Sequence, residues 1–334
     1  MNAERAYRYN VSSMHEIFIN SFGRLRSGWR LLIYVAVISV LSFFLTQILR
    51  VVYLLLETRS IPQPQFVADV IYRLGLLLVA LGAGYLCARY LEELPWKSLG
   101  LTLHKGWFRD LLIGSAIGLV SLGVAVGIAM FGSGLKFSFS DFALTSITTS
   151  MLGSLTLFIV AALAEEALFR GYGLQTMARA RLAWVGVLLT LLLFGLAHEE
   201  NPNVVPLVTF TNTALAGLWL AVAYLRTRSL WLPLGVHWSW NWALGWFFGL
   251  PVSGTQLVSH PLLKANDLGP FWLTGGSYGI EGGVACTVSL ALFTVFLWRT
   301  PWLSPTPELK KLTSEENPAT PSSVLSIRPA DDRA

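Results

Sequence analysis

The sequence predicts an all-α fold, a polytopic transmembrane helical bundle with about eight spans. Of the 334 residues, 54% are hydrophobic and 13% are charged, about half of the charged fraction of ~25% that is usual in soluble domains. Several stretches of about 18 or more residues are almost uncharged, and that length is enough for a membrane-spanning helix. The net charge of +5 is typical of basic loops on one side of a membrane, and we expect no nucleic-acid partner.

The N-terminal part of the chain consists of a basic segment and three helices. Residues 1–30 are polar and basic, and we expect this segment on the cytoplasmic side. Residues 31–144 are expected to hold helices 1–3, which are predicted over about 31–56, 66–90 and 108–131.

Residues 145–250 are expected to form a core of helices 4–7. Helix 4 begins near Ile147, and helices 5–7 are predicted over about 182–198, 204–225 and 230–250. Residues 251–299 contain an outer loop and helix 8, which is predicted over about 280–298. Residues 300–334 carry six Pro together with Ser, Thr and charged residues, a composition typical of a disordered tail.

The basic residues are distributed unevenly along this topology. An even number of spans places both termini on one side. The outer side then carries five basic residues, and the other 19 of the 24 Lys and Arg lie on the inner side. The positive-inside rule therefore predicts an integral multi-pass protein with both termini in the cytoplasm. The five outer basic residues are Arg50, Arg59, Arg73, Lys136 and Lys264.

An acidic pair lies at the far end of the apolar helix 4. Charge at the centre of a bilayer costs about 2.5–3.5 kcal/mol on insertion scales, so Glu165 and Glu166 are functional candidates. On a helix, Glu166 and Arg170 are four residues apart and can pair. Glu165 points about 100° away from Glu166 and is left available for another partner.

Three further polar residues lie on the neighbouring predicted helices. His198 is at the end of helix 5, and His237 and Asn241 share one face of helix 7. Counted at about 1.5 Å per residue from the helix turns, Glu165 and His198 lie at nearly the same height. His237 and Asn241 lie somewhat closer to the turn side, so all four can converge in the inner half of the bilayer. We expect such a site to open towards the cytoplasm.

These residue types favour hydrolysis of a carbonyl compound, most simply a peptide bond. A carboxylate beside a neutral imidazole can hold and deprotonate water, with or without a divalent metal such as zinc. A second imidazole and an amide can stabilise an oxyanion. The candidate metal ligands are Glu165, His198 and His237. The sequence has no Ser-His-Asp set, which a serine protease would need, and no His-Glu-x-x-His pattern, which is typical of zinc metalloproteases.

Three ordered motifs resemble those of the CAAX-processing and bacteriocin-immunity (CPBP) intramembrane protease family, which includes the type II CAAX prenyl endopeptidases. They are Glu165-Glu166-x-x-x-Arg170-Gly171, Phe194-x-x-x-His198 and His237-x-x-x-Asn241. The resemblance covers roughly residues 145–250. It implies an endopeptidase in which Glu165 and His198 hold the water, His237 and Asn241 stabilise the oxyanion, and Glu166 and Arg170 have supporting roles. The expected partners are the lipid bilayer and a protein or peptide substrate, with or without a lipid modification.

Two other classes of function fit the same residues. A non-catalytic membrane scaffold or immunity protein would keep the bundle without using the site. An ion-coupled transporter would use the buried acids and histidines as an ion pathway, but it predicts broken helices in two matching halves, and the sequence has no such internal symmetry.

Overall fold

The computed structural model describes residues 16–59, 64–133 and 135–314. The predicted all-α bundle is confirmed. Five helical segments are long and apolar enough to cross a membrane, and two shorter apolar helices accompany them. The five are Ser27–Thr58, Gln65–Glu92, Trp107–Gly132, Leu144–Arg179 and Val208–Thr227; the shorter two are Ala183–Leu196 and Val284–Arg299.

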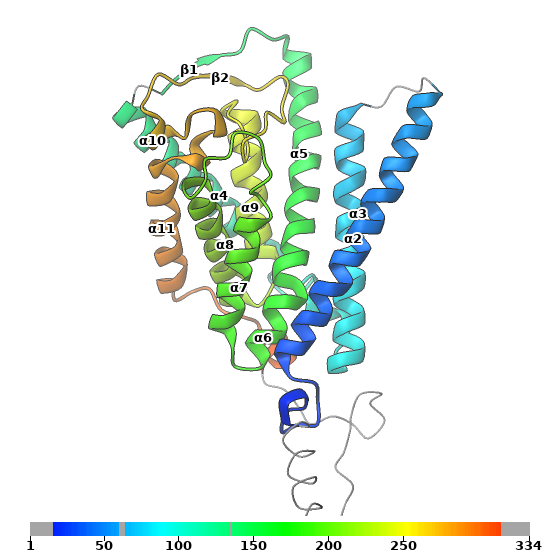
Figure 1. Ribbon diagram of the computed structural model, residues 1–334. Coiled ribbons are helices and arrows are strands. Elements are labelled where there is room, and N and C mark those ends of the chain that lie inside the picture. Colours follow the sequence, from blue (N-terminus) through cyan, green and yellow to red (C-terminus); the bar gives the residue numbers. More distant parts are fainter. Residues whose placement is uncertain (1–15, 60–63, 134, 315–334) are drawn as a thin grey trace, which may run out of the picture.

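Helices α2 (Ser27–Thr58) and α3 (Gln65–Glu92) form an antiparallel hairpin beside the remaining helices (Figure 1). A 3₁₀ turn, η1 (Trp96–Leu99), leads to α4 (Trp107–Ser133). The buried residues of α2 all lie in its first eight positions, and those of α3 lie between Ala80 and Glu92. The hairpin is therefore embedded at one end, which we call the base.

At the base, one ion pair joins the two helices of the hairpin, and a second ion pair and the Tyr34 hydroxyl connect the hairpin to the core. Glu92 Oε2 lies 2.7 Å from Arg30 Nη1 and 3.3 Å from Arg179 Nη1, and all three side chains are almost fully buried. The Tyr34 hydroxyl donates to the carbonyl oxygen of Leu168 at 2.9 Å. Buried charges need such pairing, because an unpaired one would cost several kcal/mol. These contacts close the base of the molecule.

The fourth predicted helix continues well beyond the acidic pair. It runs as α5 (Leu144–Glu166), continues without a break as a π-helical segment η2 (Ala167–Leu174), and ends in α6 (Gln175–Arg179). The chain then turns back into α7 (Ala183–Leu196).

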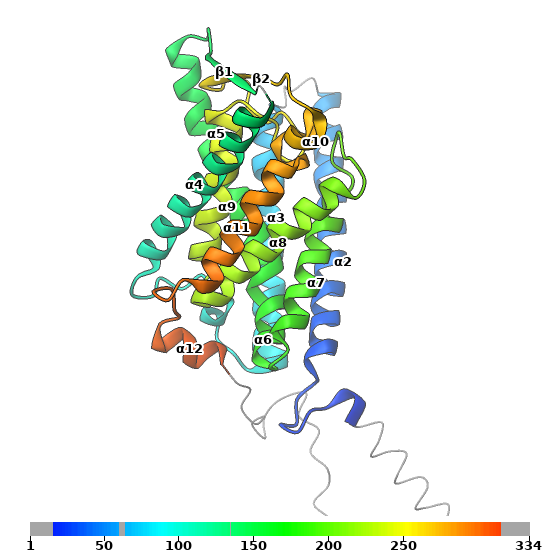
Figure 2. The same cartoon turned by 90° about the vertical axis from the view of Figure 1, so that its left-hand side faces the viewer.

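The remaining helices complete the core. They are α8 (Val208–Thr227), α9 (Trp231–Trp242) with its π-helical continuation η3 (Ala243–Phe247), and α11 (Val284–Arg299). Figure 2 shows α11 beside α4 and α8, and these helices are in contact. Large apolar side chains of α4, α8, α9 and α11 form the main hydrophobic cluster.

Short elements cover the end opposite the base. Strands β1 (Lys136–Phe139) and β2 (Leu263–Asn266) pair antiparallel, with Lys136 opposite Asn266. A short helix α10 (Phe271–Thr274) and the 3₁₀ turns η4 (Gly276–Tyr278) and η5 (Ile280–Gly282) follow before α11.

The expectation of a tail disordered from residue 300 is wrong for residues 300–314. Helix α12 (Pro307–Thr313) packs at the base near α6 (Figure 2), and the side chain of its N-cap residue Thr306 accepts from the backbone of Leu309. Leu309 is buried, and the guanidinium of Arg226 donates to backbone carbonyls of this segment. These apolar and polar anchors outweigh the disorder-promoting composition. The rest of the tail (315–334) and residues 1–15 of the basic segment lie outside the described residues.

Candidate active site

A cavity of about 890 Å³ runs between α3 on one side and α5, α7, α8 and α9 on the other. It is lined by Glu165, His198, His237 and Asn241, so the structure brings the four predicted catalytic residues to one cavity. The four come from three segments of the core: Glu165 from α5, His198 from the turn after α7, and His237 and Asn241 from α9.

The cavity extends away from the base. Its lining includes Gln65 at the start of α3 and Thr255 in the loop after η3, and none of its described lining residues comes from the loops at the base. The expected opening towards the cytoplasm stays a prediction, since it depends on which side of the membrane the base faces.

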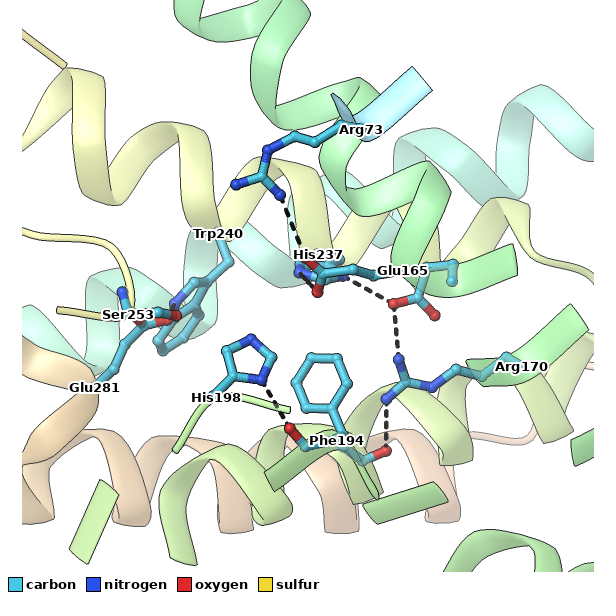
Figure 3. Close-up of polar contacts among 11 residues, drawn as sticks. Arg73, Glu165, Arg170, Phe194, His198, His237, Trp240, Ser253 and Glu281 are labelled. Carbon is cyan, nitrogen blue, oxygen red and sulfur yellow. Dashed lines mark hydrogen bonds and ion pairs between the residues drawn. The ribbon is translucent and has the colours of Figure 1, made fainter. Parts of the chain in front are cut away.

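Glu166 is the fixed centre of the site. It is fully buried, and its Oε1 lies 3.1 Å from Arg170 Nη1 and 2.8 Å from His237 Nδ1 (Figure 3). Arg170 also donates to the carbonyl oxygen of Gly217 at 3.0 Å, and its guanidinium lies 4.7 Å from the ring centroid of Phe194. The expected pair of Glu166 and Arg170 is thus present, and it holds the imidazole of His237 in place.

Glu165 faces the cavity, in contrast to its neighbour. Its side chain is 24% exposed, whereas that of Glu166 is 0% exposed. Of the two carboxylates, only that of Glu165 can therefore meet water or a substrate. Glu165 Oε2 lies 3.7 Å from His237 Nε2, a separation longer than a hydrogen bond and short enough for a shared water beside it.

His198 has one ring nitrogen engaged and one available. Its Nδ1 lies 2.7 Å from the carbonyl oxygen of Phe194, so Nδ1 must carry the proton. In the neutral tautomer, Nε2 is then a hydrogen-bond acceptor. The Phe194 ring lies between the two histidine rings, with centroid distances of 4.7 Å to His198 and 6.2 Å to His237.

His237 has a carboxylate on each side. Nδ1 donates to Glu166 Oε1, and Nε2 points towards Glu165. Burial disfavours a charged imidazolium, whereas the two carboxylates favour it. In the charged form, Nε2 is a donor into the cavity, as an oxyanion site requires.

Sequence reasoning missed two charged residues of the cavity. Arg73 of α3 places its Nη1 3.6 Å from Glu165 Oε1 (Figure 3), although it was counted only as an outer basic residue. Its signal was a basic residue inside the apolar stretch 66–90. Glu281 lines the opposite wall and accepts from Trp240 Nε1 at 2.9 Å and from the backbone of Ser253 at 2.6 Å.

The Glu281 carboxylate affects one group of the outer loop. Burial and the nearby charge of Glu281 raise the pKa of Tyr278 to about 12. Tyr278 therefore stays protonated and uncharged at neutral pH.

The predicted metal ligands do not form a recognisable metal site. Among the described residues, no group of three or more His, Cys, Asp or Glu side chains has a geometry that could hold a metal ion. Glu165 and His237 are near each other, but His237 Nδ1 is occupied by Glu166 and its Nε2 lies 3.7 Å from the Glu165 carboxylate. We therefore derive no catalytic step through a metal.

Two of the three helices that carry the motifs, α5 and α9, change their winding next to the site. The switch to π-helix occurs directly after Glu166 in α5 and two residues after Asn241 in α9. Such π-helical segments within helices are frequent at functional sites, because they redirect the side chains that follow.

Comparison with known proteins agrees with this geometry. The profile of the family described as type II CAAX prenyl endopeptidase Rce1-like matches residues 147–243. The chain is also 36% identical over 152 residues to an uncharacterised 24.3 kDa protein of Escherichia coli, an alignment that covers 43% of this chain and 67% of that protein. The chain belongs to the Rce1-like family of type II CAAX prenyl endopeptidases. As a member of this family it is a membrane-embedded, protease-type protein, and the matched segment contains all six residues of the predicted site.

Proposed function

We propose that this Rce1-like protein is an intramembrane endopeptidase in which Glu165 activates a water molecule for attack on a peptide bond. The observation that carries the proposal is the contrast between the two acidic neighbours. Glu166 is sealed and paired, and Glu165 faces a cavity that also receives His198, His237 and Asn241. The rest of the chain is proposed to serve this core, residues 145–250.

The water is bound between two acceptors. Glu165 accepts one of its protons as general base, and Nε2 of His198 accepts the other hydrogen, since Nδ1 of His198 already donates to a carbonyl. The water oxygen attacks the carbonyl carbon of the scissile bond as its proton passes to Glu165. When the tetrahedral intermediate collapses, the C–N bond breaks and the leaving amine takes that proton from Glu165.

The oxyanion of the intermediate is stabilised by the other helix. His237 in its charged form donates through Nε2, and Asn241, one turn further along α9, donates through its amide. Glu166 and Arg170 contribute indirectly, because they orient the His237 ring and compensate its charge.

The substrate class is proposed from the cavity and from the family name. The lining combines aromatic and aliphatic side chains with a comparable number of polar and charged ones, which suits an extended peptide whose backbone and side chains offer both polar and apolar groups. The name of the family points to peptides that carry a prenylated cysteine followed by three C-terminal residues. Prenylated and unmodified peptides are therefore the two forms to compare.

The test is cleavage of a quenched fluorescent peptide by the purified protein in proteoliposomes. The peptide ends in farnesyl-cysteine and three further residues, and a twin lacks the farnesyl group. We expect wild type to cleave at least one of them and Glu165→Gln to be inactive, because Gln keeps the shape but cannot take the proton. The variant should melt at the wild-type temperature. An equally active Glu165→Gln protein would contradict the proposal.

A metal requirement is tested in the same assay. Dialysis against a strong chelator, followed by elemental analysis, separates the two mechanisms that the sequence left open. We expect activity to survive at metal levels far below one per chain, since the described residues offer no three-ligand set. Loss on dialysis with recovery on adding zinc would contradict this expectation.

A further inference from the structure

Glu165, the general base of the proposed mechanism, is paired with an arginine from outside the catalytic core. Arg73 lies on α3, beyond the segment that the family profile matches. Its side chain is 27% exposed and that of Glu165 is 24% exposed, so the pair lies at the cavity surface and is not sealed in the core. Arg73 is the only Lys or Arg among the described residues that line the cavity.

The ion pair with Arg73 makes Glu165 a weaker general base. A carboxylate next to a guanidinium holds its negative charge firmly and takes up a proton reluctantly. When Glu165 takes the proton of water, its charge is lost and Arg73 remains without its counter-ion. In a cavity that a bound peptide has emptied of water, an uncompensated cation is costly.

The other charges of the cavity do not remove this cost. Glu166 is already shared by Arg170 and His237. Glu281 is bound on the opposite wall by Trp240 and Ser253. Asp69 lies one turn before Arg73 on α3, accepts from Gln65 at 2.9 Å, and has no ion pair with Arg73 within 4.0 Å among the described residues. An anion must therefore come from the substrate.

We propose that Arg73 is a carboxylate-binding subsite, which exchanges Glu165 for a carboxylate of the peptide substrate when the substrate binds. The planar guanidinium can bind a carboxylate through two parallel hydrogen bonds. The exchange frees Glu165 to act as base and keeps Arg73 compensated throughout the reaction. This inference rests on the proposed endopeptidase function. It adds that the preferred substrates carry a carboxylate near the scissile bond, either at the C-terminus or on a side chain.

The experiment measures binding to the inactive Glu165→Gln protein in detergent micelles. The probes are three fluorescent farnesyl-cysteine peptides: one with a free C-terminal carboxylate, one with a C-terminal amide, and one amide with an aspartate in the last three residues. We expect one or both carboxylate peptides to bind about 10- to 100-fold more tightly than the neutral amide, the range for hydrogen bonds to a charged group. The two carboxylate probes distinguish a terminal from a side-chain source.

The variants show whether Arg73 causes this preference. Adding Arg73→Gln should abolish it, and Arg73→Lys should retain only part of it, because Lys cannot form the planar two-bond contact. Arg50→Gln, which removes an exposed arginine of α2, is the matched control and should leave the preference intact. If Arg73 had only a structural role, Arg73→Gln would weaken the binding of all three peptides equally. Equal binding of the three, or no binding of any, would overturn the proposal.

Kinetics of the active protein separate this proposal from the proposed function. If wild type and Arg73→Gln cleave the acid and amide peptides with the same KM, the proposed protease function stands and the proposed subsite is wrong. Carboxylate-selective binding without cleavage of any peptide would support the subsite and count against the protease.

Discussion

At the scale of single residues, the site is an arrangement of charges around one sealed carboxylate. Glu166 accepts from Arg170 and from His237, and this fixes the ring that faces Glu165. The i,i+4 spacing predicted the pair of Glu166 and Arg170 from the sequence. The contact with His237 could not be predicted in this way, because it joins residues 71 positions apart and depends on how α9 packs against α5.

Arg170→Ala should destabilise the protein as well as reduce its activity. The substitution leaves Glu166 buried without its counter-ion, which costs about 3–5 kcal/mol in the free energy of unfolding. Unfolding in mixed micelles measures this directly, with the exposed Arg50→Ala as the control. Arg170→Lys should recover part of the loss only, since Arg170 also donates to Gly217 and stacks on Phe194. Unaltered stability of Arg170→Ala would contradict the structural role of the pair.

Asn241→Ala should give a slow but folded enzyme. Loss of one oxyanion donor typically lowers kcat by about 10²–10³. We expect KM to change little, because Asn241 is proposed to bind the intermediate and not the ground state. Single-turnover cleavage of the farnesyl-cysteine peptide gives both values. A raised KM with normal kcat would instead assign Asn241 to substrate binding.

At the scale of elements, the wall that carries His237 is held by close backbone packing. A Cβ at Gly118 of α4 would overlap Ser239 Oγ and the carbonyl oxygen of Val236. A Cβ at Gly235 of α9 would likewise overlap the carbonyl oxygen of Leu111. Small residues at such crossings let helices approach closely in membranes. The stretch 108–131 is rich in glycine, but this composition does not indicate which helix packs against it.

Gly118→Ala should therefore push α4 away from α9 and lower both stability and activity. Gly123→Ala in the same helix is the matched control, because a Cβ there meets nothing within 4 Å. Alanine is also the better helix former, so the control should be neutral or slightly stabilising, by up to about 1 kcal/mol. The melting temperatures of wild type and the two variants measure this difference in stability. Equal melting temperatures would mean that α4 and α9 can move apart without a loss of stability.

The π-helical segments and helix α12 show where sequence reasoning stops. Hydropathy and period identify helices 4 and 7 and place their motif residues at one depth. They do not indicate a change of winding after Glu166 or Asn241, which depends on tertiary packing. Likewise, α12 forms in a segment of disordered composition because Leu309 finds a buried position at the base.

At the scale of the whole molecule, the cavity extends away from the base of the bundle. The basic residues predict that the termini are cytoplasmic. The outer end can be tested by cysteine labelling, because the two native cysteines, Cys87 and Cys286, are buried. Asp141→Cys and Asp267→Cys should react with a membrane-impermeant maleimide in intact cells, and Lys311→Cys only after permeabilisation. The reverse pattern would invert the topology and would turn the cavity towards the cytoplasm.

The length of α2 connects the site to the lipid around it. Its 32 residues span about 48 Å along the helix axis, more than the ~30 Å of hydrocarbon in a typical bilayer. A helix of this length adjusts by tilting, and the hairpin is anchored at the base, so its far end must swing as the bilayer thins or thickens. That far end holds Arg73 against Glu165. The length of the lipid acyl chains should therefore change the separation of this ion pair. Turnover in phosphatidylcholine vesicles of increasing chain length should pass through an optimum. An unchanged rate would mean that the hairpin is rigid.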